Sequence, residues 1–229
     1  MKNKILLLLL ILILLLIPAI IKTLAARQLE KELPALIGKA DAYRVTVNSP
    51  LFGLLQGKIN RLRIVGKRVE IKDNPVIQEL EIILSEVKLN LKSKKIERVK
   101  ESVFSASFRE KDLNKYLENR PRPFEEARLE LKADKLLIKG RYRVFLLTLP
   151  VELEAAFYVV DEEQIFIRLE SLKLSEINFP KEFFGLAEAW VNPLVDLKKG
   201  NLAAKIKSIT IKPGNLIIKG SFSLPETQK

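Results

Sequence analysis

The chain of 229 residues contains no cysteine and no histidine. The absence of cysteine excludes disulfide bonds, thiol nucleophiles and cysteine-ligated metal sites. The absence of histidine removes the commonest general base, the usual zinc ligand, and every serine–histidine or cysteine–histidine catalytic arrangement. The sequence also has no glycine-rich phosphate-binding loop. We therefore expect a protein that is not an enzyme and that has no cofactor and no metal ion.

An acid- or lysine-dependent hydrolase is the enzymatic alternative that remains. Ser85 and Lys88 have the spacing of a serine–lysine dyad. That chemistry needs both side chains on one face, which a helix provides at positions i and i+3 and a strand does not. Because the surrounding residues alternate as in a strand, we expect these two side chains to point apart.

Acidic residues are absent before Glu30. After a head that carries Lys2 and Lys4, residues 5–17 are thirteen consecutive Leu and Ile, a layout typical of a secretory signal or an N-terminal membrane anchor. The apolar stretch 5–21 has seventeen residues. As a helix it spans about 25 Å, against a hydrocarbon core of about 30 Å.

Cleavage and retention of this leader both stay open. Pro18 and the small residues around Ala25 favour a cleaved signal, whereas the apolar residues 24–26 favour an anchor that continues past Lys22, whose long side chain can reach the interface. We expect residues 1–21 to form an uncleaved transmembrane helix with its basic head in the cytoplasm. In either case the body is expected outside the cytoplasm.

The chain is basic, with forty Lys and Arg against twenty-eight Asp and Glu. The first 27 residues hold four of the basic residues and no acid, so the remainder carries 36 − 28 = +8. A basic exported domain beside a membrane suggests anionic lipid headgroups as partners, since each Lys or Arg near such a surface contributes about 1 kcal/mol. A solvated surface rich in Lys and Glu is the alternative. Nucleic acid is not expected, because export separates the body from it.

Apolar residues at helical spacing predict three helices. The first covers residues 22–42, with a kink at Pro34 and an end near Gly38. The second covers residues 110–119 and the third residues 180–191.

Alternation of apolar and polar residues begins at Tyr43 and predicts antiparallel strands with one buried face. A change of parity across Ser85-Glu86 predicts a β-bulge or a strand break. The predicted fold class is therefore α+β, with one domain over residues 43–224. A juxtamembrane segment precedes this domain at residues 22–42, and a short tail follows at residues 225–229.

An internal repeat supports a long antiparallel meander. Residues 129–132 followed by 136–142 recur eighty residues later as 209–212 followed by 216–222, with the apolar parity kept. We interpret this as a repeated strand–turn–strand unit. Chance convergence of two simple hairpin patterns is the alternative.

Several strands carry more apolar residues than a sheet with one wet face needs. In residues 151–160 the odd positions are apolar throughout, and the even positions become Ala156, Tyr158 and Val160. Such strands are expected to be covered on both faces along part of their length. The cover is either the predicted helices or a greasy ligand in an aliphatic-lined groove, because such a cavity accepts apolar molecules.

The segment Ser49-Pro-Leu-Phe-Gly-Leu-Leu-Gln-Gly-Lys-Ile-Asn-Arg-Leu-Arg-Ile64 resembles the opening signature of the LmeA-like phospholipid-binding family, envelope proteins of bacteria. Residues 108–117, 192–197 and 216–220 fit the same pattern, so the resemblance covers residues 43–224. It implies a tubular lipid-binding fold, in which a long, highly twisted antiparallel sheet wraps around a helix and encloses a lipid groove. It also implies phospholipid binding and a role in envelope maintenance. It carries over no headgroup-binding motif.

Candidate site residues fall into an apolar and a basic set. The apolar candidates for lining a lipid groove, or for entering a membrane, are Phe52, Leu54, Leu55, Phe145, Phe157, Phe166, Phe183, Phe184 and Trp190. Ordinary core packing is the alternative for each. The basic candidates for headgroups or the membrane surface are Arg61, Arg63, Lys67, Arg68, Lys92, Lys94, Lys95 and Arg98. A solvated surface is the alternative for these.

The sequence thus predicts a membrane-anchored extracytoplasmic protein that holds or shuttles phospholipid acyl chains in an apolar groove. Its expected partners are phospholipid and the membrane. The alternative is a structural envelope protein with a filled core and no lipid ligand.

Overall fold

The computed structural model describes residues 22–90, 95–118, 125–133, 135–144, 147–174, 177–178, 188–189, 191–199 and 203–223. The predicted leader, most of the predicted helix 180–191 and the tail lie outside these residues. Within the described part of the chain, no helix is long and apolar enough to cross a membrane.

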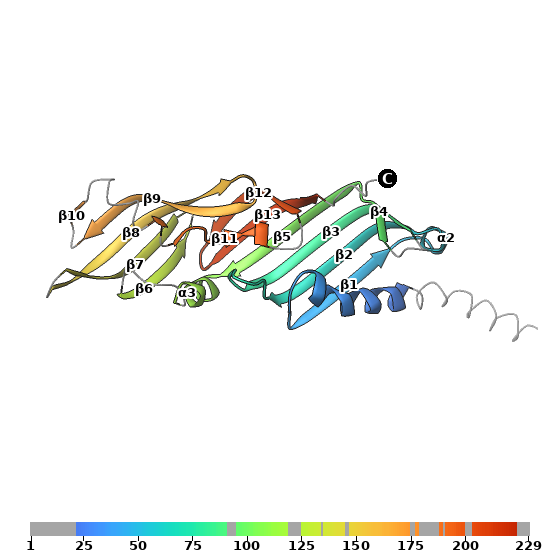
Figure 1. Ribbon diagram of the computed structural model, residues 1–229, viewed down its shortest axis with the longest axis horizontal. Coiled ribbons are helices and arrows are strands. Elements are labelled where there is room, and N and C mark those ends of the chain that lie inside the picture. Colours follow the sequence, from blue (N-terminus) through green and yellow to red (C-terminus); the bar gives the residue numbers. More distant parts are fainter. Residues whose placement is uncertain are drawn as a thin grey trace, which may run out of the picture.

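The described chain is α+β and forms two antiparallel sheets that lie end to end in an elongated molecule (Figure 1). The first sheet has seven strands in the order β1-β2-β3-β5-β13-β12, with β4 paired to β3. Its strands are β1 (Ala42–Asn48), β2 (Lys58–Val69), β3 (Ile77–Asn90), β4 (Lys95–Arg98), β5 (Glu101–Arg109), β12 (Ala203–Lys212) and β13 (Asn215–Ser223).

The second sheet has six strands in the order β10-β9-β8-β7-β6, with β11 paired to β9. Its strands are β6 (Glu125–Lys132), β7 (Lys135–Val144), β8 (Leu147–Val160), β9 (Gln164–Leu174), β10 (Ile177–Asn178) and β11 (Val195–Asp196). The 3-10 helix η2 (Leu197–Lys199) follows β11.

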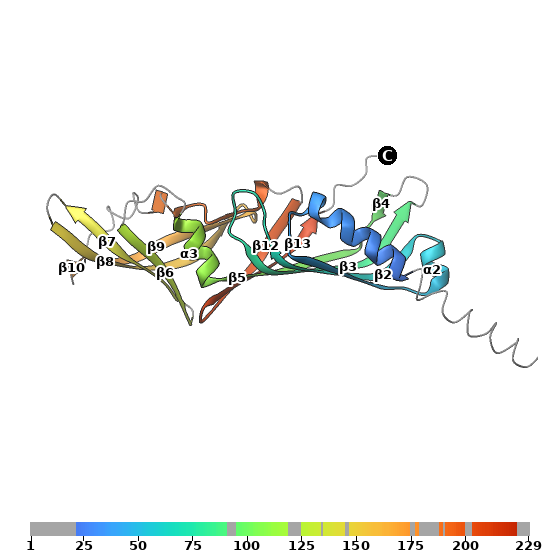
Figure 2. The ribbon, with the colours of Figure 1, turned by 90° about the horizontal axis from the view of Figure 1, so that it is seen from below.

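The helices lie on one side of the sheets (Figure 2). The first helix covers residues 22–36 and buries Leu33 against the first sheet. It ends two residues before Gly38, near the predicted end, and the Tyr43 hydroxyl donates a hydrogen bond of 2.8 Å to the Gly38 carbonyl. The predicted second helix is confirmed as α3 (Glu110–Glu118), which buries Leu113 and Leu117. A short helix, α2 (Leu51–Leu55), was not predicted.

Period-two burial is the rule in the strands, as predicted. In β3, Leu80, Ile82 and Leu84 are buried, and the parity then changes so that Val87 is buried. The change occurs at Glu86, whose φ of 49° lies in the left-handed region. The strand is not broken there, and its pairing with β2 keeps one register on both sides of the change.

Both copies of the predicted repeat are hairpins with equivalent registers. Leu129 faces Ile138 in β6–β7, and eighty residues later Ile209 faces Ile218 in β12–β13. The prediction of a long antiparallel meander is confirmed only in part, because consecutive strands are neighbours from β6 to β10 and from β1 to β3 but not throughout. The second hairpin returns to the first sheet, where β13 pairs with β12 on one side and with the much earlier strand β5 on the other. Sequence alternation records only which face of a strand is buried and does not specify its neighbours.

Side chains from α3 bind the main chain of β6, an edge strand of the second sheet. Glu110 accepts a hydrogen bond from the amide of Leu131 at 2.7 Å. One turn later, Asn114 donates to the carbonyl of Leu129 at 2.9 Å and accepts from its amide at 2.6 Å. These bonds satisfy main-chain groups that an edge strand otherwise leaves open.

The same arrangement recurs on β9. Glu188 accepts from the amide of Leu169 at 2.7 Å. Asn192 donates to the carbonyl of Ile167 at 2.7 Å and accepts from its amide at 2.6 Å. Glu and Asn at positions i and i+4 of a helix share a face, so this Glu-x-x-x-Asn spacing is a sequence signal that our prediction missed.

Candidate functional site

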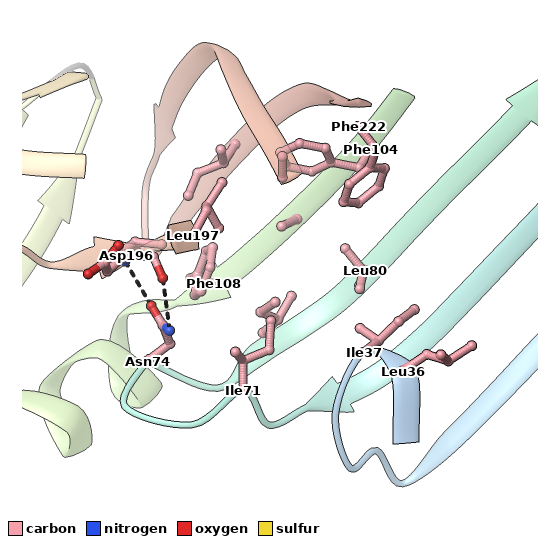
Figure 3. A pocket seen from close by; sticks show the side chains of 15 residues that line it. Leu36, Ile37, Ile71, Asn74, Leu80, Phe104, Phe108, Asp196, Leu197 and Phe222 are labelled. Carbon is pink, nitrogen blue, oxygen red and sulfur yellow. Dashed lines mark hydrogen bonds between the residues drawn. The ribbon is translucent and has the colours of Figure 1, made fainter. Parts of the chain in front are cut away.

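An apolar groove lies on the helix-bearing side of the first sheet (Figure 3). Its cavity volume is about 60 Å³. Sites that enclose a small organic ligand commonly measure about 300–1,000 Å³, so this groove offers an apolar surface for part of a chain and does not enclose a whole ligand. All but two of the lining residues are apolar: Leu36, Ile37, Ile71, Ile77, Leu80, Phe104, Ala106, Phe108, Val195, Leu197, Ala204, Ile218 and Phe222.

The floor of the groove comes from strands that are distant in sequence. Phe104, Ala106 and Phe108 follow one another on the buried face of β5, and Ile218 of β13 lies beside Ala106 in register. Ala204 of β12 adds a second small side chain to the lining. Because alanine ends at Cβ, these two positions leave room between the larger side chains of the lining.

The rim is formed by the end of the first helix and by Phe222, which packs on Phe104 of the floor. Leu36, which lines the groove, is 55% exposed. Phe104 and Phe222 lie with their ring centroids 5.0 Å apart. Figure 3 shows Leu36 and Ile37 on the opposite side of the groove from Phe222. Leu36 therefore exposes apolar surface next to the groove, where an apolar ligand can make a first contact.

Asn74 and Asp196 are the two polar residues of the lining. The Asn74 amide donates to the Asp196 carbonyl at 3.2 Å and accepts from the Asp196 amide at 2.9 Å, as the dashed lines in Figure 3 show. The Asp196 carboxylate accepts from the amide of Lys198 at 3.1 Å. These hydrogen bonds tie the turn between β2 and β3 to β11 and hold one wall of the groove.

The lining of this groove can bind apolar molecules, and we identify no catalytic group among its residues. In the described part of the chain, no group of three or more acidic residues could hold a metal ion. The polar groups that line the groove are engaged with one another or with the main chain. Affinity would therefore come from the hydrophobic effect, which acts without direction and selects poorly among apolar chains.

Those predicted apolar site residues that the structure describes lie elsewhere. Phe52 and Leu55 project from α2 with 75% and 60% exposure, and Leu54 packs partly against the core. Phe157 also packs against the core, whereas Phe166 contacts Tyr158 with ring centroids 5.8 Å apart. None of these residues lines the groove. Phe145, Phe183, Phe184 and Trp190 lie outside the described residues.

We expected β8 to be covered on both faces along part of its length, and the structure shows that its two faces are buried to different degrees. Val151, Leu153 and Ala155 are buried, whereas the apolar residues at the even positions, Ala156 to Val160, are only partly buried. On that outer face, Tyr158 is covered by neighbouring side chains of β9, including the Arg168 guanidinium at 5.5 Å from the ring centroid. The groove instead lies on the first sheet.

The predicted basic residues are distributed over several sites. Arg61 and Lys67 are exposed on β2, and Arg63 forms an ion pair of 2.6 Å with Glu81. Arg68 pairs with Asp112.

The other basic candidates belong to the β3–β4 region. Arg98 is exposed on β4, and Lys95 begins the same strand. Lys92 and Lys94 lie outside the described residues. A headgroup role for any of the basic candidates stays a prediction.

A family model for LmeA-like phospholipid-binding proteins matches residues 15–221. The chain belongs to the LmeA-like phospholipid-binding family. The resemblance that the sequence motifs indicated is thereby confirmed, and the match contains every groove-lining residue except Phe222. No curated protein and no solved structure matches the chain. Membership of the LmeA-like family suggests phospholipid binding, and no enzymatic family is indicated.

Proposed function

We propose that this protein is a membrane-anchored, extracytoplasmic phospholipid-binding protein whose groove holds acyl chains. The observation that carries this proposal is the apolar groove between the first helix and strands β3, β5, β12 and β13. Its lining offers thirteen apolar residues and two polar ones. The fold that we propose is tubular and lipid-binding, with the curled sheet wrapped around the first helix.

The hydrophobic effect supplies the binding energy in this proposal. Each methylene moved from water into the groove contributes about 0.8 kcal/mol. The groove is open on one side, so a phospholipid can place a chain against Phe104, Ala106 and Phe108 while its headgroup stays in water. The protein then holds or shuttles the lipid without reading its headgroup inside the groove.

The leader supports the proposed location. Residues 5–21 are apolar and follow a basic head, which is the pattern of an anchor with the body on the far side of the membrane. An anchored lipid carrier works within reach of one bilayer, which fits a role in maintaining the cell envelope.

Native mass spectrometry of the full chain tests the groove. We expect the purified wild type to carry phospholipid that survives gentle exchange into a volatile buffer. Leu36→Glu places a charge at the exposed rim and should reduce the lipid-bound fraction several-fold. Val159→Glu is the matched control, because Val159 is also exposed but lies on the second sheet.

Equal lipid loading in both variants would contradict the proposed use of the groove. Wild-type protein that is lipid-free after extraction from membranes, and that takes up no phospholipid from vesicles, would favour the alternative of a structural envelope protein with no lipid ligand.

A further inference from the structure

Helix α2 at the end of the first sheet exposes side chains that normally seek the core. Four of its five residues are large and apolar: Leu51, Phe52, Leu54 and Leu55. No residue of α2 is buried. Phe52 is 75% exposed and Leu55 60%. Contiguous exposed apolar side chains, unlike single ones, mark sites of interaction with another protein or with a membrane.

The main chain holds α2 in this position. Ser49 is buried and donates a hydrogen bond of 2.8 Å to the carbonyl of Lys58, which closes the loop that contains α2. Gly53 lies at this closure, where a Cβ would stand 3.0 Å from Ser49 Oγ and 3.2 Å from the Lys58 carbonyl oxygen. The Gly57 carbonyl accepts from the amide of Leu89 at 2.7 Å. The exposed apolar side chains are therefore presented on a braced turn.

A row of cations lies beside α2. Lys58, Lys88 and Arg98 face one another directly across β2, β3 and β4, and all three are exposed. One acid, Glu97, pairs with Lys88 at 2.9 Å, so the group keeps two positive charges. Like charges placed directly opposite each other destabilise a sheet, which makes an anionic partner the natural counterpart of this row.

Both features lie at the end of the molecule where the first helix begins. In Figures 1 and 2, α2, β4 and the start of that helix occupy the same end. Leu24 in the first turn of the helix and Ile96 in β4 are also exposed. Of the seven large hydrophobic residues that are exposed in the described part of the chain, four thus lie at this end. The apolar residues 5–21 directly precede the same helix in sequence.

We propose that this end, made of α2 with Lys58, Lys88 and Arg98, is a docking surface for an anionic lipid bilayer. Phe52 and Leu55 enter the boundary between headgroups and acyl chains, and the cation row binds the anionic headgroups. Apolar side chains flanked by Lys and Arg are the combination that binds such interfaces. A lipid surface is favoured over a protein partner because the sequence next to this end is itself an apolar run of membrane type.

The proposal rests on the membrane location proposed above but does not depend on lipid in the groove. Because the wild-type chain has no cysteine, a single introduced cysteine can carry a fluorophore at one chosen position. We would label Phe52→Cys, Val159→Cys and Leu36→Cys in the full chain and reconstitute each in vesicles. The vesicles would contain phosphatidylcholine and phosphatidylglycerol with bromine atoms on the acyl chains, which quench a fluorophore that enters the bilayer.

We expect quenching at position 52 to exceed quenching at position 159 several-fold. It should fall in vesicles of phosphatidylcholine alone and at high salt. The triple variant K58Q/K88Q/R98Q should lower it, whereas the control K207Q/K212Q/K219Q, which removes three exposed cations from β12 and β13, should not.

Equal quenching at positions 52 and 159, or an equal effect of the two triple variants, would overturn the docking surface. Position 36 reports the groove separately. Quenching at 36 without quenching at 52 would support groove loading and overturn docking, and the reverse result would support docking and count against groove loading.

Discussion

Arg68 in β2 reaches the buried carboxylate of Asp112 in α3, with its Nη1 atom 3.3 Å from Oδ1 and 3.5 Å from Oδ2. Asp112 is only 5% exposed. Arg68 itself has a φ of 51°, in the left-handed region that residues with a side chain seldom adopt. This ion pair joins residues 44 positions apart and holds α3 against the first sheet.

Arg68→Ala should destabilise the fold, because it leaves the Asp112 carboxylate buried without a partner. Loss of one partner of a fully buried pair costs about 3–5 kcal/mol. Because the Arg68 side chain is 35% exposed, we expect a smaller loss, of about 1–3 kcal/mol. Denaturant unfolding of the wild type, Arg68→Ala, Asp112→Asn and the double variant measures the coupling. A double variant whose loss equals the sum of the two single losses would show that the pair contributes nothing.

Asn114→Ala should also destabilise the fold, because Leu129 then loses partners for both its amide and its carbonyl. Leu129 is fully buried, and a buried polar group without a partner costs about 1–3 kcal/mol. At about 2–4 °C per kcal/mol for a chain of this size, the melting temperature should fall by several degrees. Asn215→Ala is the control, since Asn215 is exposed and makes only a long hydrogen bond of 3.4 Å. Equal melting temperatures for the two variants would refute this role of Asn114.

Gly220→Ala should be more damaging than Gly214→Ala. A Cβ at Gly220 would lie 2.0 Å from the Lys205 carbonyl oxygen and 2.5 Å from the Phe104 ring, so β12 and the groove lining both have to move. Overpacking of this kind typically costs about 1–3 kcal/mol, and lipid binding should weaken as well. At Gly214 the φ is +72° but no heavy atom lies within 4 Å of the added carbon, so the cost there is about 1 kcal/mol. Thermal unfolding and native mass spectrometry distinguish the two. A larger loss at Gly214 would contradict the close approach at Gly220.

A rise in pH above about 10 should lower the free energy of unfolding of the wild type relative to that of Tyr43→Phe. Burial raises the pKa of Tyr43 to about 12. Between the unfolded pKa near 10 and this value, the unfolded chain loses the phenolic proton while the folded chain keeps it, so the free energy of unfolding falls as the pH rises. Phenylalanine has no such proton.

At neutral pH, Tyr43→Phe should cost about 1 kcal/mol, through loss of the hydrogen bond to the Gly38 carbonyl. Two pKa units correspond to about 2.7 kcal/mol, and partial exposure of the ring reduces the expected loss to about 1–2 kcal/mol, which is enough to cancel or reverse the advantage of the wild type at neutral pH. Urea unfolding of both proteins from pH 8 to 12 gives the difference, in which the other titrating groups cancel. A difference that stays constant over this range would contradict the raised pKa.

Much of the secondary structure follows from local patterns. Alternation of apolar residues predicts the strands, and the spacing of Leu113 and Leu117 predicts α3, because burial of one face repeats every two residues in a strand and about every 3.6 in a helix. The repeat likewise predicts two hairpins, since residues 129–142 and 209–222 share both parity and turn position. Membership of the LmeA-like family was also predicted correctly from the sequence motifs.

The groove was decided by the tertiary structure. Ala106 of β5 and Ala204 of β12 line the same groove because β13 lies between their two strands in the sheet and pairs with both. Alternation marks each alanine as buried but does not say which other side chains surround it. The exposure of α2 is also decided by the tertiary structure. The apolar sequence Leu51–Leu55 is typical of a buried segment, but the loop around Gly53 places it on the surface. Periodicity is a property of one segment, whereas a groove or an exposed surface is a relation between segments, and only the folded arrangement specifies that relation.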